Sequence, residues 1–251
     1  MAAQVRATPS PQVADGIYRL GDHYDNWYVL EDGGRLTVID AGLPGHWEQL
    51  PSLLTTIGRT VGDIVAVLLT HYHPDHLGCA EPIRQAAQAR VLIHSDDAEG
   101  ARRGGVTPPM SLGGARQMIR PACVRYMMSS LRAGARHIPP ITELATFADG
   151  ERLDVPGHPS VIHTPGHTPG ECVLHVEDRD VVFTGDALVT FDPSTGKVGP
   201  AVLGAPFTED AAGAFASLGR IRATGASTLL PGHGEPWRDG VADAVTLAQR
   251  H

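Results

Sequence analysis

Three histidines and one aspartate lie within six consecutive positions of this chain: His71, His73, Asp75 and His76. In an extended segment, residues two positions apart share a face, so His71 and His73 can bind one cation together. Asp75 and His76 enter an expected helix and point to a second position. Imidazole and carboxylate groups are ligands of both zinc and iron. The spacing therefore predicts two adjacent metal positions, because crowding three imidazoles into one loop has no evident structural purpose.

The flanking sequence places this cluster in a loop at the end of a sheet. Residues 64–70 form a nearly continuous apolar run, which is typical of a strand buried on both faces. Residues 75–88 have a helical pattern. Functional sites are usually built in such loops. Further strands are expected at 17–20, 27–30, 36–39, 91–94, 160–163, 172–176, 181–184 and 228–230, and further helices at 47–57 and 208–223.

A segment in the middle of the chain, residues 98–140, departs from this alternation. Glycine, proline and arginine interrupt it, and its apolar residues fall at partly helical spacing. We interpret it as a helical insertion in a single domain spanning residues 1–251, which a mobile arm at residues 1–13 precedes. Its methionines indicate an adaptable apolar wall. Two interpretations stay open: a lid that shapes the substrate pocket, or a surface for core packing or for a homodimer.

Composition restricts the class of partner. The chain of 251 residues has 42% hydrophobic and 19% charged residues, which is typical of a globular protein. Its net charge of −8 argues against nucleic acid, because a phosphate-binding protein needs a basic surface. No apolar run is long enough for a membrane span or a signal peptide. The three cysteines lie far apart and form no disulfide framework, so we expect a cytoplasmic protein that acts on a small molecule.

The loop sequence also has the form of a known signature. Residues 70–78 read Thr-His-Tyr-His-Pro-Asp-His-Leu-Gly and resemble the signature of the metallo-β-lactamase fold superfamily. Shorter motifs occur in that family's order at residues 38–42, 163–168, 183–186 and 231–234, so the resemblance covers nearly the whole chain. It implies an α/β fold of the αββα type, a four-layer sandwich with the site at one edge of its two sheets.

The resemblance further implies seven metal ligands, three for each of two metals and one bridge: His71, His73 and His167; Asp75, His76 and His233; and Asp186. The local sequence agrees with this set. A Pro-Gly turn presents His167 at a loop tip, and glycines on both sides of His233 allow the backbone to approach a buried centre. Asp40 and His163 are expected outside the ligand set, where they would orient ligating histidines.

Two divalent metals that share a water would lower its pKa from 15.7 toward roughly 7 and so supply hydroxide at neutral pH. We expect zinc, with iron or manganese as alternatives. The hydroxide would attack a carbonyl carbon, and the metals would hold the resulting oxyanion. Ester, thioester and lactone bonds all fit this chemistry. The leaving group needs a proton, for which Asp75 and Tyr72 are the candidates.

The motifs also indicate a branch of the family. A bridging carboxylate at Asp186 resembles the glyoxalase II and lactonase branches, whereas true β-lactamases generally carry another residue there. The main prediction is thus a binuclear hydrolase of a small molecule with an apolar portion. A second hypothesis is a mononuclear iron dioxygenase acting on a persulfide, since such enzymes share the leading His-x-His-x-Asp-His. A β-lactam hydrolase and a catalytically inactive ligand-binding protein are also compatible with these motifs.

Overall fold

The computed structural model describes residues 11–105, 118–204 and 207–250. Its larger sheet has seven strands in chain order. The first four form an antiparallel meander, and the last three join the meander in parallel. These strands are β1 (Gln12–Ala14), β2 (Ile17–Gly21), β3 (Asn26–Asp32), β4 (Arg35–Ile39), β5 (Ile64–Leu68), β6 (Arg90–His94) and β7 (Ala145–Phe147).

The smaller sheet has the order β13-β10-β9-β8, and a separate hairpin joins β11 to β12. Its strands are β8 (Ser160–His163), β9 (Cys172–Val176), β10 (Val181–Gly185) and β13 (Thr228–Pro231), and the hairpin strands are β11 (Val189–Asp192) and β12 (Lys197–Ala201). The helices are α1 (Gln49–Thr56), α2 (Pro74–Leu77), α3 (Ala80–Ala87), α4 (Ala98–Arg102), α6 (Pro121–Arg132), α7 (Ala211–Ala223) and α8 (Val241–Ala248).

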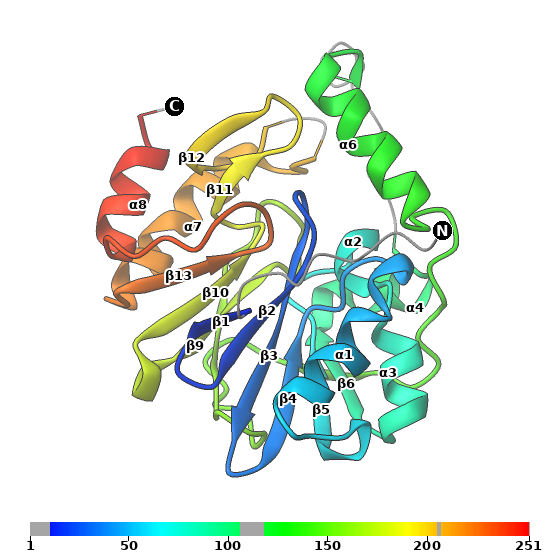
Figure 1. The fold of residues 1–251 in the computed structure, drawn as a ribbon. Coiled ribbons are helices and arrows are strands. Elements are labelled where there is room, and N and C mark those ends of the chain that lie inside the picture. Colours follow the sequence, from blue (N-terminus) through cyan, green and yellow to red (C-terminus); the bar gives the residue numbers. More distant parts are fainter. Residues whose placement is uncertain (1–10, 106–117, 205–206, 251) are drawn as a thin grey trace.

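The two sheets pack face to face, and helices cover the outer face of each (Figure 1). Leu53 of α1 and Ile83 of α3 belong to the core on the larger sheet's outer face. Leu68 and Phe183 belong to the core between the sheets. Leu218 of α7 belongs to the third core, behind the smaller sheet. Because each fully buried side chain of this size contributes about 1.5–3 kcal/mol, these three cores hold the four layers together. This is the expected αββα sandwich.

Strand direction brings several loops to one edge of this sandwich. In the smaller sheet, β10 runs parallel to β13 and antiparallel to β9, which in turn is antiparallel to β8. The carboxyl ends of β8, β10 and β13 therefore lie at the same edge. The loops that follow these three strands contain the later motifs, and the loop after β5 contains the histidine cluster.

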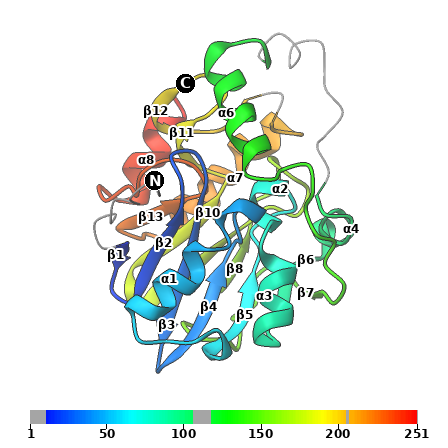
Figure 2. The ribbon, with the colours of Figure 1, turned by 45° about the vertical axis from the view of Figure 1, so that its right-hand side comes forward.

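The expected helical insertion connects two neighbouring strands of the larger sheet. It contains α4 and α6 among the described residues, and residues 106–117 lie outside them. The chain then enters β7, which pairs in parallel with β6, the strand before the insertion. Figures 1 and 2 both show α6 at the same end of the molecule as α2 and the β11–β12 hairpin.

Two segments differ from the expected elements. Gln12 and Val13 of the expected arm form part of β1, and residues 1–10 of it lie outside the described chain. The expected helix at 75–88 is divided into α2 and α3 at Gly78, where the N–H donates to the Gly42 carbonyl at 2.7 Å. This bond fastens the start of the helical region to the loop after β4. No helix of the described residues is long and apolar enough to cross a membrane.

Candidate metal centre

The first three ligand candidates, His71, His73 and His167, form a trio of buried imidazoles. One nitrogen of each lies within 4.8 Å of the others, and His167 Nε2 is 2.8 Å from His73 Nδ1. Burial lowers the pKa of His73 to about 4 and that of His167 to about 3, and it lowers the pKa of His71 as well. All three rings are therefore neutral at pH 7, which is the form of imidazole that binds metals.

The second trio is Asp75, His76 and His233, whose ligand atoms also lie within 4.8 Å of one another. Its histidines have the opposite electrostatics. Burial lowers the pKa of His76, but the carboxylates of Asp40, Asp186 and Asp75 outweigh burial and raise it to about 9. Asp186 raises the pKa of His233 in the same way against the effect of burial. A cation bound here would displace these protons, because a ligating histidine must be neutral.

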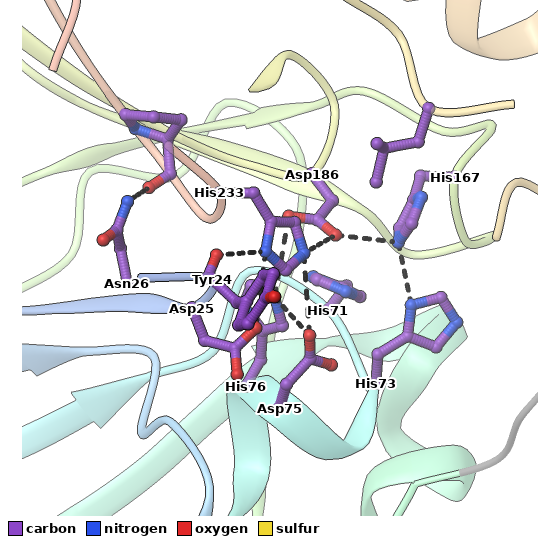
Figure 3. Close-up of polar contacts among 12 residues, drawn as sticks. Tyr24, Asp25, Asn26, His71, His73, Asp75, His76, His167, Asp186 and His233 are labelled. Atoms are coloured by element: carbon purple, nitrogen blue, oxygen red, sulfur yellow. Dashed lines mark hydrogen bonds and ion pairs between the residues drawn. The ribbon is translucent and has the colours of Figure 1, made fainter. Parts of the chain in front are cut away.

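Asp186 lies between the two trios (Figure 3). Its Oδ2 is 3.0 Å from His233 Nε2 and 3.4 Å from His167 Nε2. Its Oδ1 is 3.6 Å from His76 Nε2. Only glycine fits at position 232, because a Cβ there would collide with Asp186 and lie 2.7 Å from His76 Cε1. The carboxylate thus has the position that the sequence assigns to a bridge.

The donor atoms of the centre fit a bound metal. His71 Nε2, His76 Nε2 and Asp186 Oδ1 are buried and have no hydrogen-bond partner within the described chain. Buried polar atoms are nearly always paired, since leaving one unpaired costs about 1–3 kcal/mol. These three residues also form a group with ligand atoms within 4.8 Å of one another. A cation among them would satisfy atoms that the protein itself leaves unpaired.

The two residues expected to orient ligands lie in different surroundings. Asp40 Oδ2 is 2.9 Å from His76 Nδ1, so it fixes the ring with Nε2 toward Asp186. His163 does not contact a ligand candidate. Its ring stacks on His94 with centroids 4.1 Å apart, and its Nε2 lies 2.8 Å from the Pro169 carbonyl oxygen. It therefore contacts only the backbone of the loop that carries His167.

Other groups that orient the histidines come from positions without a sequence signal. Glu171 Oε2 lies 3.2 Å from His71 Nδ1. His233 Nδ1 lies 2.7 Å from the Tyr24 carbonyl oxygen and 3.4 Å from Asp25 Oδ1. Each of these contacts engages the ring nitrogen that faces away from the centre, which directs the other nitrogen inward.

Asp97 connects the two loops that supply the first trio. Its carboxylate accepts hydrogen bonds from the Tyr72 N–H at 3.1 Å, the Thr168 hydroxyl at 2.6 Å and the Gly170 N–H at 2.6 Å. Burial raises the pKa of Asp97 to about 6, against the effect of these three bonds. The residue thereby holds the loop of His71 and His73 against the loop of His167.

The two expected proton donors, Asp75 and Tyr72, do not present a proton to the centre. Burial opposes ionisation of Asp75, but His76 and His233 outweigh it and lower its pKa, so Asp75 is a carboxylate suited to ligation. The Tyr72 hydroxyl donates to Glu209, and Tyr72 is not among the residues that line the cavity over the metal centre. The hydroxyl nearest the centre belongs to Tyr126 of α6, which donates to Asp75 Oδ2 at 2.8 Å.

We expect Tyr126→Phe to weaken metal binding by the second trio about 10- to 100-fold, the usual effect of removing a partner of a ligand. The lost hydroxyl leaves one Asp75 oxygen without its donor and the carboxylate free to rotate. Metal affinity measured by competition with a chromophoric chelator checks this result. Tyr72→Phe is the matched control, since it removes a hydroxyl bonded outside the centre. Equal affinities of Tyr126→Phe and the unaltered protein would show that Tyr126 only packs.

A cavity of about 290 Å³ opens onto the centre. Its base contains ligand candidates from both trios together with Asp186. Its walls are mostly apolar and come from α6 and three loops: Leu43, Met127, Leu131, Leu203 and Phe207. Such a pocket holds the apolar part of a small molecule and leaves a polar bond facing the base.

Comparisons with known proteins agree with this architecture. The sequence model of the Metallo-beta-lactamase superfamily matches residues 20–233. The probable metallo-hydrolase YflN of Bacillus subtilis is 27% identical over 267 residues, which cover 98% of this chain and 95% of that protein. The acyl-coenzyme A thioesterase MBLAC2 of Gallus gallus is 28% identical over 190 residues, or 72% of this chain and 63% of that protein.

A solved structure has the same fold. TTHA1623 in a di-iron-bound form is 28% identical, with a TM-score of 0.60 over 88% of this chain and 92% of that one. Both the sequence and the fold of the chain thus match one family over most of its length. The chain belongs to the metallo-β-lactamase superfamily, a group of metallo-hydrolases.

Proposed function

We propose that this protein is a binuclear hydrolase that cleaves an ester, thioester or lactone bond in a small molecule with an apolar portion. The observation that carries the proposal is the position of Asp186, within 3.6 Å of a nitrogen from each trio, at the base of an apolar cavity. His71, His73 and His167 would hold one metal, and Asp75, His76 and His233 the other. Zinc, iron or manganese would fit these donors.

Two bound metals would supply an activated water and a Lewis acid for the substrate carbonyl. The chain's own residues do the rest. Asp186 keeps a negative charge between the trios, because His233 and His76 hold its pKa low against the effect of burial. The walls formed by Met127, Leu131 and Phe207 bind the apolar part and exclude water. Tyr126 holds Asp75 and places a hydroxyl at the edge of the reaction site.

Two relatives support the finer parts of the proposal. The thioesterase activity named for MBLAC2 supports a thioester or a related acyl bond as the target. The di-iron form of TTHA1623 supports a centre that holds two metals. Since the chain spans 63% of the length of MBLAC2, the thioester is one member of the proposed class, and esters and lactones are tested beside it.

Metal analysis with a substrate panel tests this function. The protein is purified without chelators, its metals are counted by mass spectrometry, and it is assayed with a thioester, a γ-lactone, a 4-nitrophenyl ester, a cephalosporin and glutathione persulfide. We expect about two metals per chain and oxygen-independent hydrolysis of at least one acyl bond other than the β-lactam. One iron per chain with oxygen uptake on the persulfide would contradict the proposal. So would a fully loaded protein that turns over no compound in the panel.

A further inference from the structure

The basic residues of this acidic chain are unevenly distributed. Residues 100–142 contain seven of the chain's 20 basic residues, all of them arginine, and none of its 28 acidic residues. The same segment supplies α6, which forms one wall of the cavity above the metal centre. The only excess of positive charge of this size in the sequence therefore lies beside the candidate active site.

One of these arginines, Arg136, lines the cavity itself. Its side chain is exposed, so the guanidinium is accessible to a ligand that enters from solvent. The described cavity lining contains no other lysine or arginine, and its only carboxylates are Asp75 and Asp186. Both would be neutralised by bound metal. Arg136 would then be an unneutralised cation on the wall of a mostly apolar cavity.

The backbone around Arg136 is fixed. The Gly45 N–H donates to the Ala133 carbonyl at 2.8 Å, which ties the end of α6 to the loop after β4. Gly134 has a φ of +95°, a conformation that favours glycine, and its carbonyl accepts from the His137 N–H at 2.9 Å. The turn thus presents Arg136 at a defined place relative to the metal ligands at the base of the cavity.

We propose that Arg136 binds an oxyanion carried by the substrate, a carboxylate or a phosphate at the end remote from the bond that is cleaved. The planar guanidinium forms paired hydrogen bonds with either group. The other arginines of residues 100–142 raise the local concentration of an anionic substrate by their field. This inference rests on the proposed hydrolase function and specifies its substrate class as anionic acyl esters or thioesters.

Matched substrate pairs test the inference. Mono-4-nitrophenyl glutarate and 4-nitrophenyl pentanoate have acyl chains of equal length and differ by a terminal carboxylate. S-butanoyl-coenzyme A and S-butanoyl-N-acetylcysteamine share the acyl group and differ by phosphates on the leaving group. We expect the metal-loaded enzyme to prefer the anionic member of at least one pair. Arg136→Gln should reduce that ratio of kcat/KM about tenfold or more, and Arg136→Lys should reduce it less.

Arg125→Gln is the control, because it removes the same charge from α6 at an exposed position outside the cavity lining. A loss of preference in Arg136→Gln alone supports direct binding. Equal losses in both variants would contradict it, since the effect would then come from the general field of the segment. A preference that neither variant changes, or no preference in either pair, would also contradict it.

A binding measurement separates this inference from the proposed function. Calorimetric titration of the metal-loaded protein with glutarate and with pentanoate needs no turnover. We expect glutarate to bind about tenfold more tightly, and Arg136→Gln to abolish the difference. If no ester is hydrolysed but this difference is present, the hydrolase function fails and the anion site stands. If esters are hydrolysed but the difference is absent, only the anion site fails.

Discussion

Replacing Asp186 with asparagine is expected to lower kcat/KM for the best substrate by about 10³-fold or more, which corresponds to ~4 kcal/mol of transition-state stabilisation. The amide keeps the shape of the side chain and removes the charge that lies 3.0 Å from His233 Nε2 and 3.4 Å from His167 Nε2. A neutral oxygen cannot draw two cations together as a carboxylate does. Steady-state kinetics with parallel metal analysis measures the loss.

The control for Asp186→Asn is Asp149→Asn, which removes a carboxylate paired with Arg220 at the surface. It should change kcat/KM by less than about twofold, since surface ion pairs contribute only about 0–1 kcal/mol. Circular dichroism must show that Asp186→Asn is folded, so that the loss concerns the centre. A folded Asp186→Asn protein with two metals and undiminished kcat/KM would refute the bridging role.

Removing the metals is expected to lower the melting temperature by roughly 8–16 °C. A metal present at 1,000 times its Kd stabilises the folded state by about 4 kcal/mol, and 1 kcal/mol shifts Tm by about 2–4 °C in a domain of this size. Without metal, His71 Nε2, His76 Nε2 and Asp186 Oδ1 lack partners within the described chain. The buried charges of His76 and His233 then depend on nearby carboxylates alone. Melting curves before and after dialysis against a chelator measure the shift.

The control for metal removal is the addition of zinc, manganese or iron to the stripped protein. Recovery of the original Tm with one of these metals would show that the loss is caused by the metal and not by damage during dialysis. An unchanged Tm after mass spectrometry has confirmed complete removal would contradict the expected coupling between metal and folding. In that case the unpaired donors would have to be satisfied by water.

The sequence indicates the larger part of the fold because its strands are marked by apolar runs and bounded by turn residues. The strand at 64–70 appears as β5, and the segments at 160–163 and 172–176 appear as β8 and β9. Short or exposed elements carry weaker patterns. The exposed three-residue strand β7 and the hairpin β11–β12, which contains Gly199 and Pro200, therefore give no clear signal in the sequence.

The ligand candidates are predictable because they occur in compact motifs at strand ends. The groups around them are not, since each depends on how distant segments pack. Tyr126 contacts Asp75 from 51 positions away, and it lies in a helix whose apolar spacing resembles that of an ordinary packing face. Glu171 and Asp97 lie outside the recognised motifs, yet their carboxylates contact His71 and the backbone of Tyr72. Their roles follow from burial, which a linear pattern does not reveal.

The insertion begins after β6 and returns to β7, and these two strands are direct neighbours in the same sheet. The ligand candidates all come from other loops of the chain, so an exchange of residues 98–140 alters one wall of the cavity and leaves the ligand loops in place. Substrate preference and metal chemistry can therefore diverge separately during evolution. Grafting this excursion from a relative is a direct route to a new specificity on an unchanged catalytic base.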